Sequence, residues 1–514
     1  MKVFLMFEDR DFDLKEKLPA NEQALTQDLE LSTLFEAMAL GDEFLFDVAR
    51  KTVLSGLSSD LDTILYRQDV LKDCLQNPSV VRDIYGIAVE LIESRKRQWW
   101  GFWGVTRHPS SILYDAVKSV EMFVETLKKL RNTVDEHAHK FTSERFKALI
   151  AMLQEELSDA YFVSIKKHLK MLEFRNGVLI SAELGRGNEG TGYVLRKPHD
   201  DKRGWMERIL AKKSRSYRFH LADRDEAGAR ALSELRDKGI NLVANALAQS
   251  ADHILSFFEM LRLELAFYVG CLNLHEQLAR MGEPTCFPLP VPAGARSHSF
   301  KELYDVCLAL KMEQRVVGNE ANADSKNVVI ITGVNTGGKS TFLRSIGLAQ
   351  LMMQSGMFVP AESFSSSLCD GLFTHYKREE DVTMKSGQLD EELGRISQIV
   401  DHITPNPLFL FNESFAATNE REGSEIARQI VSALSEKGVR IFFVSHLYPF
   451  ARGFADKKED NRLFLRAERG ANGGRTFKLA EGEPLETSHG EDLYNRIFEA
   501  THSPETHCAV ENER

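Results

Sequence analysis

The chain has 514 residues, a formal net charge of −11, 43% hydrophobic residues and 27% charged residues, as in ordinary globular proteins. The acidic balance argues against a globally basic nucleic-acid-binding surface, although a local basic patch is compatible with it. No apolar run is long enough for a membrane span, and the apolar stretch near the N-terminus is too short for a signal peptide. Six scattered cysteines without a C-x-x-C motif argue against a disulfide framework or a zinc site and predict a reduced, cytoplasmic protein.

Helical spacing of apolar residues dominates the first part of the chain. The pattern indicates helices over 31–54, 61–75, from Pro78 to about residue 93, over 112–139 and over 143–172. Between them, Arg95–Gly104 holds three of the four tryptophans beside three cations. We interpret it as a loop whose rings enter the helical core, because aromatic side chains are more often buried than used as platforms. A stacking or membrane-surface patch is the alternative.

The apolar period changes after residue 176. Residues 177–194 predict a β-hairpin around the glycine-rich turn at 185–190. The next segment, Arg196–Arg224, carries a net charge of +6 in an acidic chain. A contact with phosphate backbones and a solvated charged face are about equally compatible with these residues. The candidate nucleic-acid contacts in this segment are Arg203, Lys212, Lys213, Arg215 and Arg218.

A proline-free helical pattern follows from Asp223 to Met281. A continuous helix of that length would extend roughly 90 Å, which suits a strut or lever. Gly228, Gly239 and Gly270 are positions where it could break or bend. Residues 282–292 hold four of the fourteen prolines and predict a linker to the next domain.

The most informative stretch is 328–341. Four apolar residues from Val328 predict a buried strand. Gly333, Gly338, Lys339 and Ser340 fit G-x-x-x-x-G-K-[ST], with an extra glycine at Gly337, before a helical run from Phe342 to Gln354. Glycines let backbone N–H groups approach a polyphosphate, and the helix N-terminus favours its negative charge. Lys339 would reach the β/γ-phosphates, and the Ser340 hydroxyl would bind Mg²⁺.

Two later strands complete the predicted site. Leu408–Phe411 is followed by Asn412 and Glu413, where phosphate-loop ATPases usually carry Asp-Glu. Asn412 can accept a hydrogen bond from a magnesium-bound water but brings no charge, whereas Glu413 suits a general base. A third strand, Arg440–Ser445, ends at His446, which would contact a γ-phosphate. Singly, Glu413 could be a helix N-terminal acid and His446 a loop histidine; together, the three strand ends favour an ATPase.

These stretches resemble the MutS family of DNA mismatch-repair ATPases. Thr332–Thr341 is similar to the family's T-G-x-N-x-G-G-K-S-T, and Gly356–Ala361 to its G-x-x-V-P-A. Ser386 and Gly387 resemble the start of its signature loop, and the region around Asp62–Gln68 resembles its helical core. The resemblance implies that Asn335, Thr336 and Thr341 also bind the nucleotide.

The resemblance implies a fold that is α/β plus all-α. Its expected parts are a helical core over 1–174, a hairpin and basic clamp over 175–224, a lever over 225–290, and an ABC-type ATPase domain over 291–514. It also implies a homodimer in which the phosphate loop of one chain and the Ser386–Gly387 loop of the other enclose each ATP. ATP and Mg²⁺ are the implied cofactors.

Three departures from the family pattern shape the functional prediction. The chain starts almost at the core, so we expect neither the mismatch-reading domain with its Phe-x-Glu wedge nor, at the other end, a nuclease-like domain. Asn412 stands in the usual Asp position, and the signature loop reads Ser-Gly-Gln-Leu-Asp-Glu from Ser386. We therefore expect a slow ATPase that binds double-stranded or branched DNA together with repair proteins. An ATP-driven switch or scaffold acting on a protein partner, without DNA, is the alternative.

Overall fold

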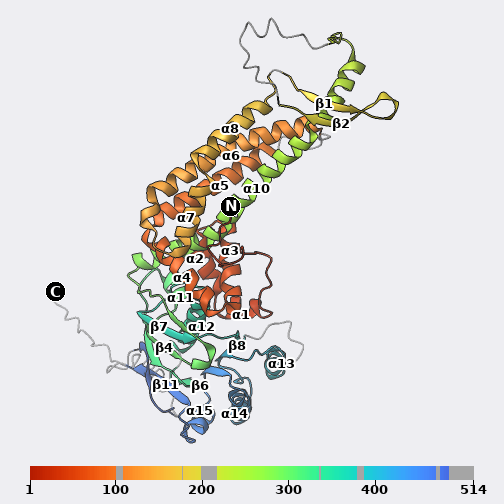
Figure 1. Ribbon diagram of the computed structural model, residues 1–514. Helices are drawn as coiled ribbons and strands as arrows, with labels where there is room; N and C mark the ends of the chain where they lie inside the picture. The colour runs from red at the N-terminus through yellow and green to blue at the C-terminus, as the bar shows by residue number, and fades with distance from the viewer. Residues whose placement is uncertain are drawn as a thin grey trace, which may run out of the picture. The chain divides into compact units, whose positions relative to one another are not determined.

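The computed structural model describes residues 1–99, 108–175, 177–197, 217–334, 337–378, 387–469 and 475–485 (Figure 1). It divides into two compact units. The first contains Met1–Phe4 and Asn77–Leu265, and the second contains Leu5–Gln76 and Ala266–Arg514. We describe each unit separately.

The first unit is mainly helical. It contains α5 (Pro78–Trp99), α6 (Pro109–His137), α7 (Glu144–Glu156), α8 (Asp159–Leu172) and the first part of α10 (Glu226–Arg280), with short 3₁₀ turns such as Ala138–Lys140. Helix α6 packs against α5, α7 and α8, and its apolar stripe is buried. The apolar residues that recur at helical spacing in the sequence form the face by which each helix packs against its neighbours.

Helix α10 is continuous over 55 residues. The three glycines that were expected to break or bend it do not interrupt it. A reason is visible at Gly239, where a Cβ would lie 2.4 Å from Ile180 Cδ1, and at Gly270, where it would lie 3.3 Å from Met38. These glycines allow close packing against the helix instead of ending it. Among the described helices, none is both long and apolar enough to cross a membrane.

The predicted hairpin is present in the first unit. Strands β1 (Ile180–Leu184) and β2 (Gly190–Leu195) pair in antiparallel register around the 3₁₀ turn Arg186–Asn188. Of the basic segment that follows, the structure describes Arg196, Lys197 and residues 217–224. Residues 217–220, which include Arg218, are exposed.

Two other helix predictions were wrong in their continuity. The run 31–54 is split into α2 (Leu31–Ala39) and α3 (Glu43–Ser55), because Leu40 and Gly41 have positive φ angles and Asp42 caps α3. The run 143–172 is split between α7 and α8, where the Ser158 hydroxyl accepts a hydrogen bond from the Tyr161 N–H. In both places a capping residue starts a new helix within an unbroken apolar pattern.

The second unit is built on a six-stranded sheet in the order β12-β11-β6-β10-β9-β8. All neighbouring pairs are parallel except β11 with β12, which are antiparallel. The strands are β6 (Val328–Thr332), β8 (Gly371–Tyr376), β9 (Pro407–Asn412), β10 (Arg440–Val444), β11 (Arg462–Arg469) and β12 (Arg475–Glu481). Helices α12 (Lys339–Gln354), α13 (Gln388–Val400), α14 (Glu420–Glu436) and α15 (Tyr448–Ala455) belong to the same unit. Phe409 and Phe411 of β9 and Phe443 of β10 pack with residues of α14 and α15 in a buried cluster.

A second, four-stranded sheet in the order β3-β7-β4-β5 belongs to the same unit. Its strands are β3 (Leu289–Val291), β4 (His298–Leu303), β5 (Asn319–Asn322) and β7 (Ser363–Ser367), with the 3₁₀ turn Ala293–Ala295 and helix α11 (Val306–Met312) beside them in the chain.

The first helices of the chain also belong to the second unit. They are α1 (Glu22–Asp28), α2, α3, the 3₁₀ turn Gly56–Ser58 and α4 (Leu61–Gln76). The Asn21 amide donates to the Leu372 carbonyl of β8 at 2.7 Å, and Gln68 donates to the Pro288 carbonyl at 3.2 Å. Gly56 sits where a Cβ would be 2.9 Å from the Ser355 backbone. Residues 1–174 were expected to form one helical domain, whereas in the structure residues 5–76 belong to the unit that contains the six-stranded sheet.

Candidate functional site

The three predicted strand ends meet at one edge of the six-stranded sheet. Strand β10 lies between β6 and β9, and Val444 is in register with both Ile331 and Asn412. Because neighbouring parallel strands end at the same edge, the residues after them converge in space. The phosphate-loop residues, Asn412–Glu413 and His446 therefore approach one another, although more than a hundred residues separate the first from the last.

The loop after β6 has a backbone that requires glycine at two positions. Gly333 has φ +120° and Gly338 has φ +85°, and Gly338 is the residue before α12. A Cβ at Gly333 would lie 2.9 Å from the Ala467 nitrogen, and one at Gly337 would lie 2.9 Å from Ala467 Cβ. The glycines thus permit both the turn and the close approach of β11. Asn335 and Thr336 lie outside the described residues.

Lys339 begins α12 with its side chain turned back over the loop. Its Nζ donates to the carbonyls of Gly333 at 2.9 Å and Val334 at 2.8 Å, and the residue is only 4% exposed. Burial lowers the Lys339 pKa to about 8, and the nearby Glu413 carboxylate opposes that shift. The site therefore holds a cation that an incoming polyanion would stabilise.

Ser340 and Asn412 are joined across the strand ends. The Ser340 hydroxyl donates to Asn412 Oδ1 at 2.8 Å. The sequence predicted these two residues as the magnesium ligands, and the structure places their oxygen atoms together. Position 412 therefore carries an amide and not a carboxylate, and the carboxylate next to it in the chain is that of Glu413.

Glu413 adopts a left-handed backbone with φ +55°, and its N–H donates to the Val444 carbonyl at 2.9 Å. Its carboxylate Oε1 accepts a hydrogen bond from His446 Nε2 at 2.8 Å. That bond lowers the Glu413 pKa, followed by the charges of His446 and Lys339, while burial acts in the opposite direction. A carboxylate kept ionised beside a histidine suits proton abstraction from water.

The backbone around Glu413 is held by residues that the sequence analysis did not identify. Glu392 of α13 is buried, and its Oε2 accepts the Phe415 N–H at 2.7 Å. The Ser414 hydroxyl lies 2.7 Å from His375 Nδ1, and burial lowers the His375 pKa to about 3, so this ring is neutral. Glu413 and Phe415 both have positive φ angles. No local sequence signal marks this support, because it joins β8, α13 and the segment after β9.

A cavity of about 520 Å³ opens beside the loop, within the size range of small-molecule sites. Its lining includes the predicted residues Gly337, Gly338, Lys339, Ser340, Thr341 and Glu413. Phe477 of β12, which is 46% exposed, also lines it and was not predicted from the sequence. Its aromatic face gives the cavity an apolar wall facing the end of the loop that carries the lysine.

Several predicted site residues lie elsewhere. Gly387 precedes α13 and is not among the described residues that line the cavity. Ser386 lies outside the described residues, as do Arg203, Lys212, Lys213 and Arg215. Arg218 is described and belongs to the first unit, not to the unit that contains this cavity.

Parts of both units match families of known proteins. The chain matches the family model of the MutS2 N-terminal domain over residues 59–281 and that of MutS domain V over residues 329–490. It is 35% identical over 137 residues to the endonuclease MutS2 of Lacticaseibacillus casei (26% of this chain, 17% of the relative). It is 31% identical over 168 residues to the endonuclease MutS2 of Thermus thermophilus (32% and 22%). It is 31% identical over 181 residues to the DNA mismatch repair protein MutS of Leptospira interrogans (32% and 21%). The chain thus spans about a fifth of the length of these curated relatives.

Proposed function

Because the chain belongs to the MutS family, we propose that it is an ATPase that couples ATP binding and hydrolysis to DNA binding in repair or recombination. The observation that carries the proposal is the meeting of three pairs at one sheet edge. They are Lys339 with the loop carbonyls, Ser340 with Asn412, and Glu413 with His446.

These residues fit a magnesium–triphosphate. The loop glycines and the N-terminus of α12 present N–H groups to the phosphates, and Lys339 supplies the cation for the β- and γ-phosphates. Ser340 would bind Mg²⁺ through its hydroxyl, and Asn412 would hold a magnesium-bound water through its amide oxygen. The ion, when bound, supplies positive charge that stabilises the developing charge on the phosphates. Phe477 offers an apolar wall beside the end of the loop that carries Lys339.

Hydrolysis is assigned to Glu413 and His446. Glu413 accepts a proton from a water whose oxygen forms a bond to the γ-phosphorus while the bond to the bridging oxygen of ADP breaks. His446 keeps the carboxylate oriented through its Nε2–H, and we assign it the contact with the γ-phosphate. Asn412 contributes no charge, so we expect a weak magnesium site and slow turnover.

We further propose a cytoplasmic homodimer with two composite sites. Gly387, the residue before α13, is not among the described residues that line the cavity of its own chain, which is compatible with a contact between Ser386–Gly387 and the nucleotide of the partner subunit. ATP would then stabilise the dimer, because it bridges the two chains. Repair proteins are the expected further partners.

DNA binding is assigned to the first unit. The exposed Arg218, together with Arg203, Lys212, Lys213 and Arg215, belongs to the basic segment after the hairpin, and its net charge of +6 suits phosphate contacts. The continuous helix α10 shares residues with both units and thus provides a covalent lever between DNA and ATP. The lack of a base-reading pattern predicts similar affinity for matched and mismatched duplexes.

The test is a mobility shift against plain, mismatched and branched DNA, with and without ATP. Neutralising Lys212, Lys213 and Arg215 to Gln should weaken binding on every DNA and flatten the log–log salt slope by up to about 2.7, at roughly 0.9 per lost contact. Lys437→Gln, an exposed lysine of the second unit, is the matched control. An unchanged slope would move the contact elsewhere, and no salt-dependent binding to any DNA would favour the protein-partner switch.

A further inference from the structure

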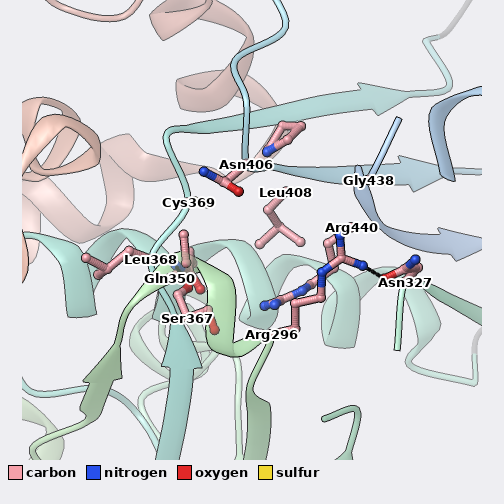
Figure 2. Close-up of a pocket in the computed structure, with 12 residues that line it drawn as sticks. Arg296, Asn327, Gln350, Ser367, Leu368, Cys369, Asn406, Leu408, Gly438 and Arg440 are labelled. Carbon is pink, nitrogen blue, oxygen red and sulfur yellow. Dashed lines mark hydrogen bonds between the residues drawn. The ribbon is translucent and has the colours of Figure 1, made fainter. Parts of the chain in front are cut away.

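A second cavity lies at the opposite edge of the six-stranded sheet, where the strands begin (Figure 2). Asn327 precedes β6, Pro407 starts β9 and Arg440 starts β10, and all three line it. Its volume is about 30 Å³, room for a few waters or one small anion and too little for a nucleotide. It shares no lining residue with the cavity beside the phosphate loop.

Two arginines form one wall of this cavity. Figure 2 shows the Arg296 and Arg440 side chains beside each other. Arg296 Nη1 donates to Asn327 Oδ1, and Arg440 Nη1 donates to the Ser297 carbonyl at 3.1 Å. A guanidinium has five N–H donors, so most donors of both groups have no protein acceptor among the described residues.

Neither arginine has an ion-pair partner in the described part of the chain. The carboxylate that acts on Arg440 from nearby is that of Asp324, and its Oδ1 already accepts the Ser297 hydroxyl at 2.8 Å and the His298 N–H at 2.7 Å. Burial lowers the Arg440 pKa, and the positive charge of Arg296 lowers it further. Arg440 is partly buried and Arg296 is exposed, so water can hydrate the spare donors of Arg296, and an anion bound between the two guanidinium groups would offset their repulsion.

The backbone holds this arrangement open. Arg296 has a left-handed backbone with φ +48°, and its carbonyl accepts the Ser325 N–H at 2.9 Å. Gly438, which has φ +80°, faces it, and a Cβ there would lie 3.2 Å from Arg296 Nη2. A side chain at position 438 would therefore press against the guanidinium, and glycine leaves its donors accessible.

We propose that Arg296 and Arg440 form an anion site for a phosphate-type dianion, distinct from the ATP site. Guanidinium groups bind tetrahedral and planar oxyanions through paired N–H donors, and two of them match the charge of phosphate near neutral pH. The Asn327 amide NH₂ adds a neutral donor beside them. An anion bound at this site would link the amino ends of β6 and β10. Lys339 and His446 follow the carboxyl ends of the same two strands in the chain.

The test is isothermal titration of inorganic phosphate into the full-length chain carrying Lys339→Ala, which removes the cation of the phosphate loop. One saturable site is expected, with binding weakened at least tenfold by Arg296→Gln and by Arg440→Gln. Arg452→Gln, at a partly exposed arginine of α15, is the matched control and should bind as its Lys339→Ala parent does. Should Arg440→Gln not fold, the exposed Arg296 carries the test by itself.

Two further titrations identify the ligand. Acetate should bind more weakly than inorganic phosphate. Titration of glycerol phosphate shows whether the site also accepts a phosphate carried on a larger molecule. Binding of inorganic phosphate or of glycerol phosphate that depends on both arginines supports the site. A phosphate site insensitive to both substitutions, no binding at millimolar phosphate, or a preference for acetate would overturn the proposal and leave a structural arginine pair.

Discussion

The buried lysine of the phosphate loop gives a prediction that can be counted in protons. The Lys339 pKa is lowered to about 8 by burial, whereas ATP phosphates would raise it far above that value. ATP binding should therefore take up protons wherever the free protein has lost them. From a pKa of about 8, the uptake is about 0.1 proton at pH 7, about 0.5 at pH 8 and about 0.9 at pH 9.

The assay is isothermal titration of Mg–ATP into the protein in buffers with different ionisation enthalpies. The slope of the observed binding enthalpy against the ionisation enthalpy of the buffer gives the number of protons exchanged. Lys339→Arg keeps a cation that does not titrate in this range, so its uptake should fall close to zero. Lys437→Arg, at an exposed position of the same unit, should behave as the wild type. Uptake that stays near zero from pH 7 to pH 9 in the wild type, or persists in Lys339→Arg, would refute this reasoning.

Three other predictions concern Asn412, Glu413 and Glu392. Asn412→Asp should raise turnover or lower the magnesium concentration needed, because it adds a charged magnesium partner; unchanged kinetics at limiting magnesium would show that this carboxylate is irrelevant. Glu413→Gln should reduce the hydrolysis rate at least about 100-fold while ATP binding persists, as expected for a general base, and an active variant would remove Glu413 from that role. Glu392→Ala should lower the free energy of unfolding by about 1–3 kcal/mol, because it leaves the buried Phe415 N–H without its acceptor. Denaturant unfolding measures this, and a stability equal to wild type would mean that another group satisfies that N–H.

The geometry around the phosphate loop could be anticipated from sequence because it follows from strand topology. Each of three apolar runs is followed by a chemically distinctive residue, and parallel pairing brings those residues to one edge. The contacts Ser340–Asn412 and Glu413–His446 are the local consequence. The mixed helical and α/β composition was expected from the resemblance to the MutS family, and the change in the period of the apolar residues along the chain agrees with it.

Other features depend on contacts between distant segments, which no local pattern records. Glu392, Ser414 and His375 support the loop after β9 from three different elements. The helix breaks at Gly41 and Ser158 occur inside apolar patterns that continue through them, so capping decided the ends and periodicity did not. The sequence likewise does not show that residues 5–76 belong to the second unit, because their helices carry the same amphipathic spacing as those of the first unit.

The central claim is that ATP controls how this chain binds DNA. The most direct measurement is the fluorescence anisotropy of labelled branched and plain duplex DNA against protein concentration, with and without Mg–ATP, for the wild type and Lys339→Ala. We predict salt-dependent binding that ATP changes in the wild type and leaves unchanged in Lys339→Ala. DNA affinity that is the same with and without ATP in the wild type, or no DNA binding at all, would contradict the account.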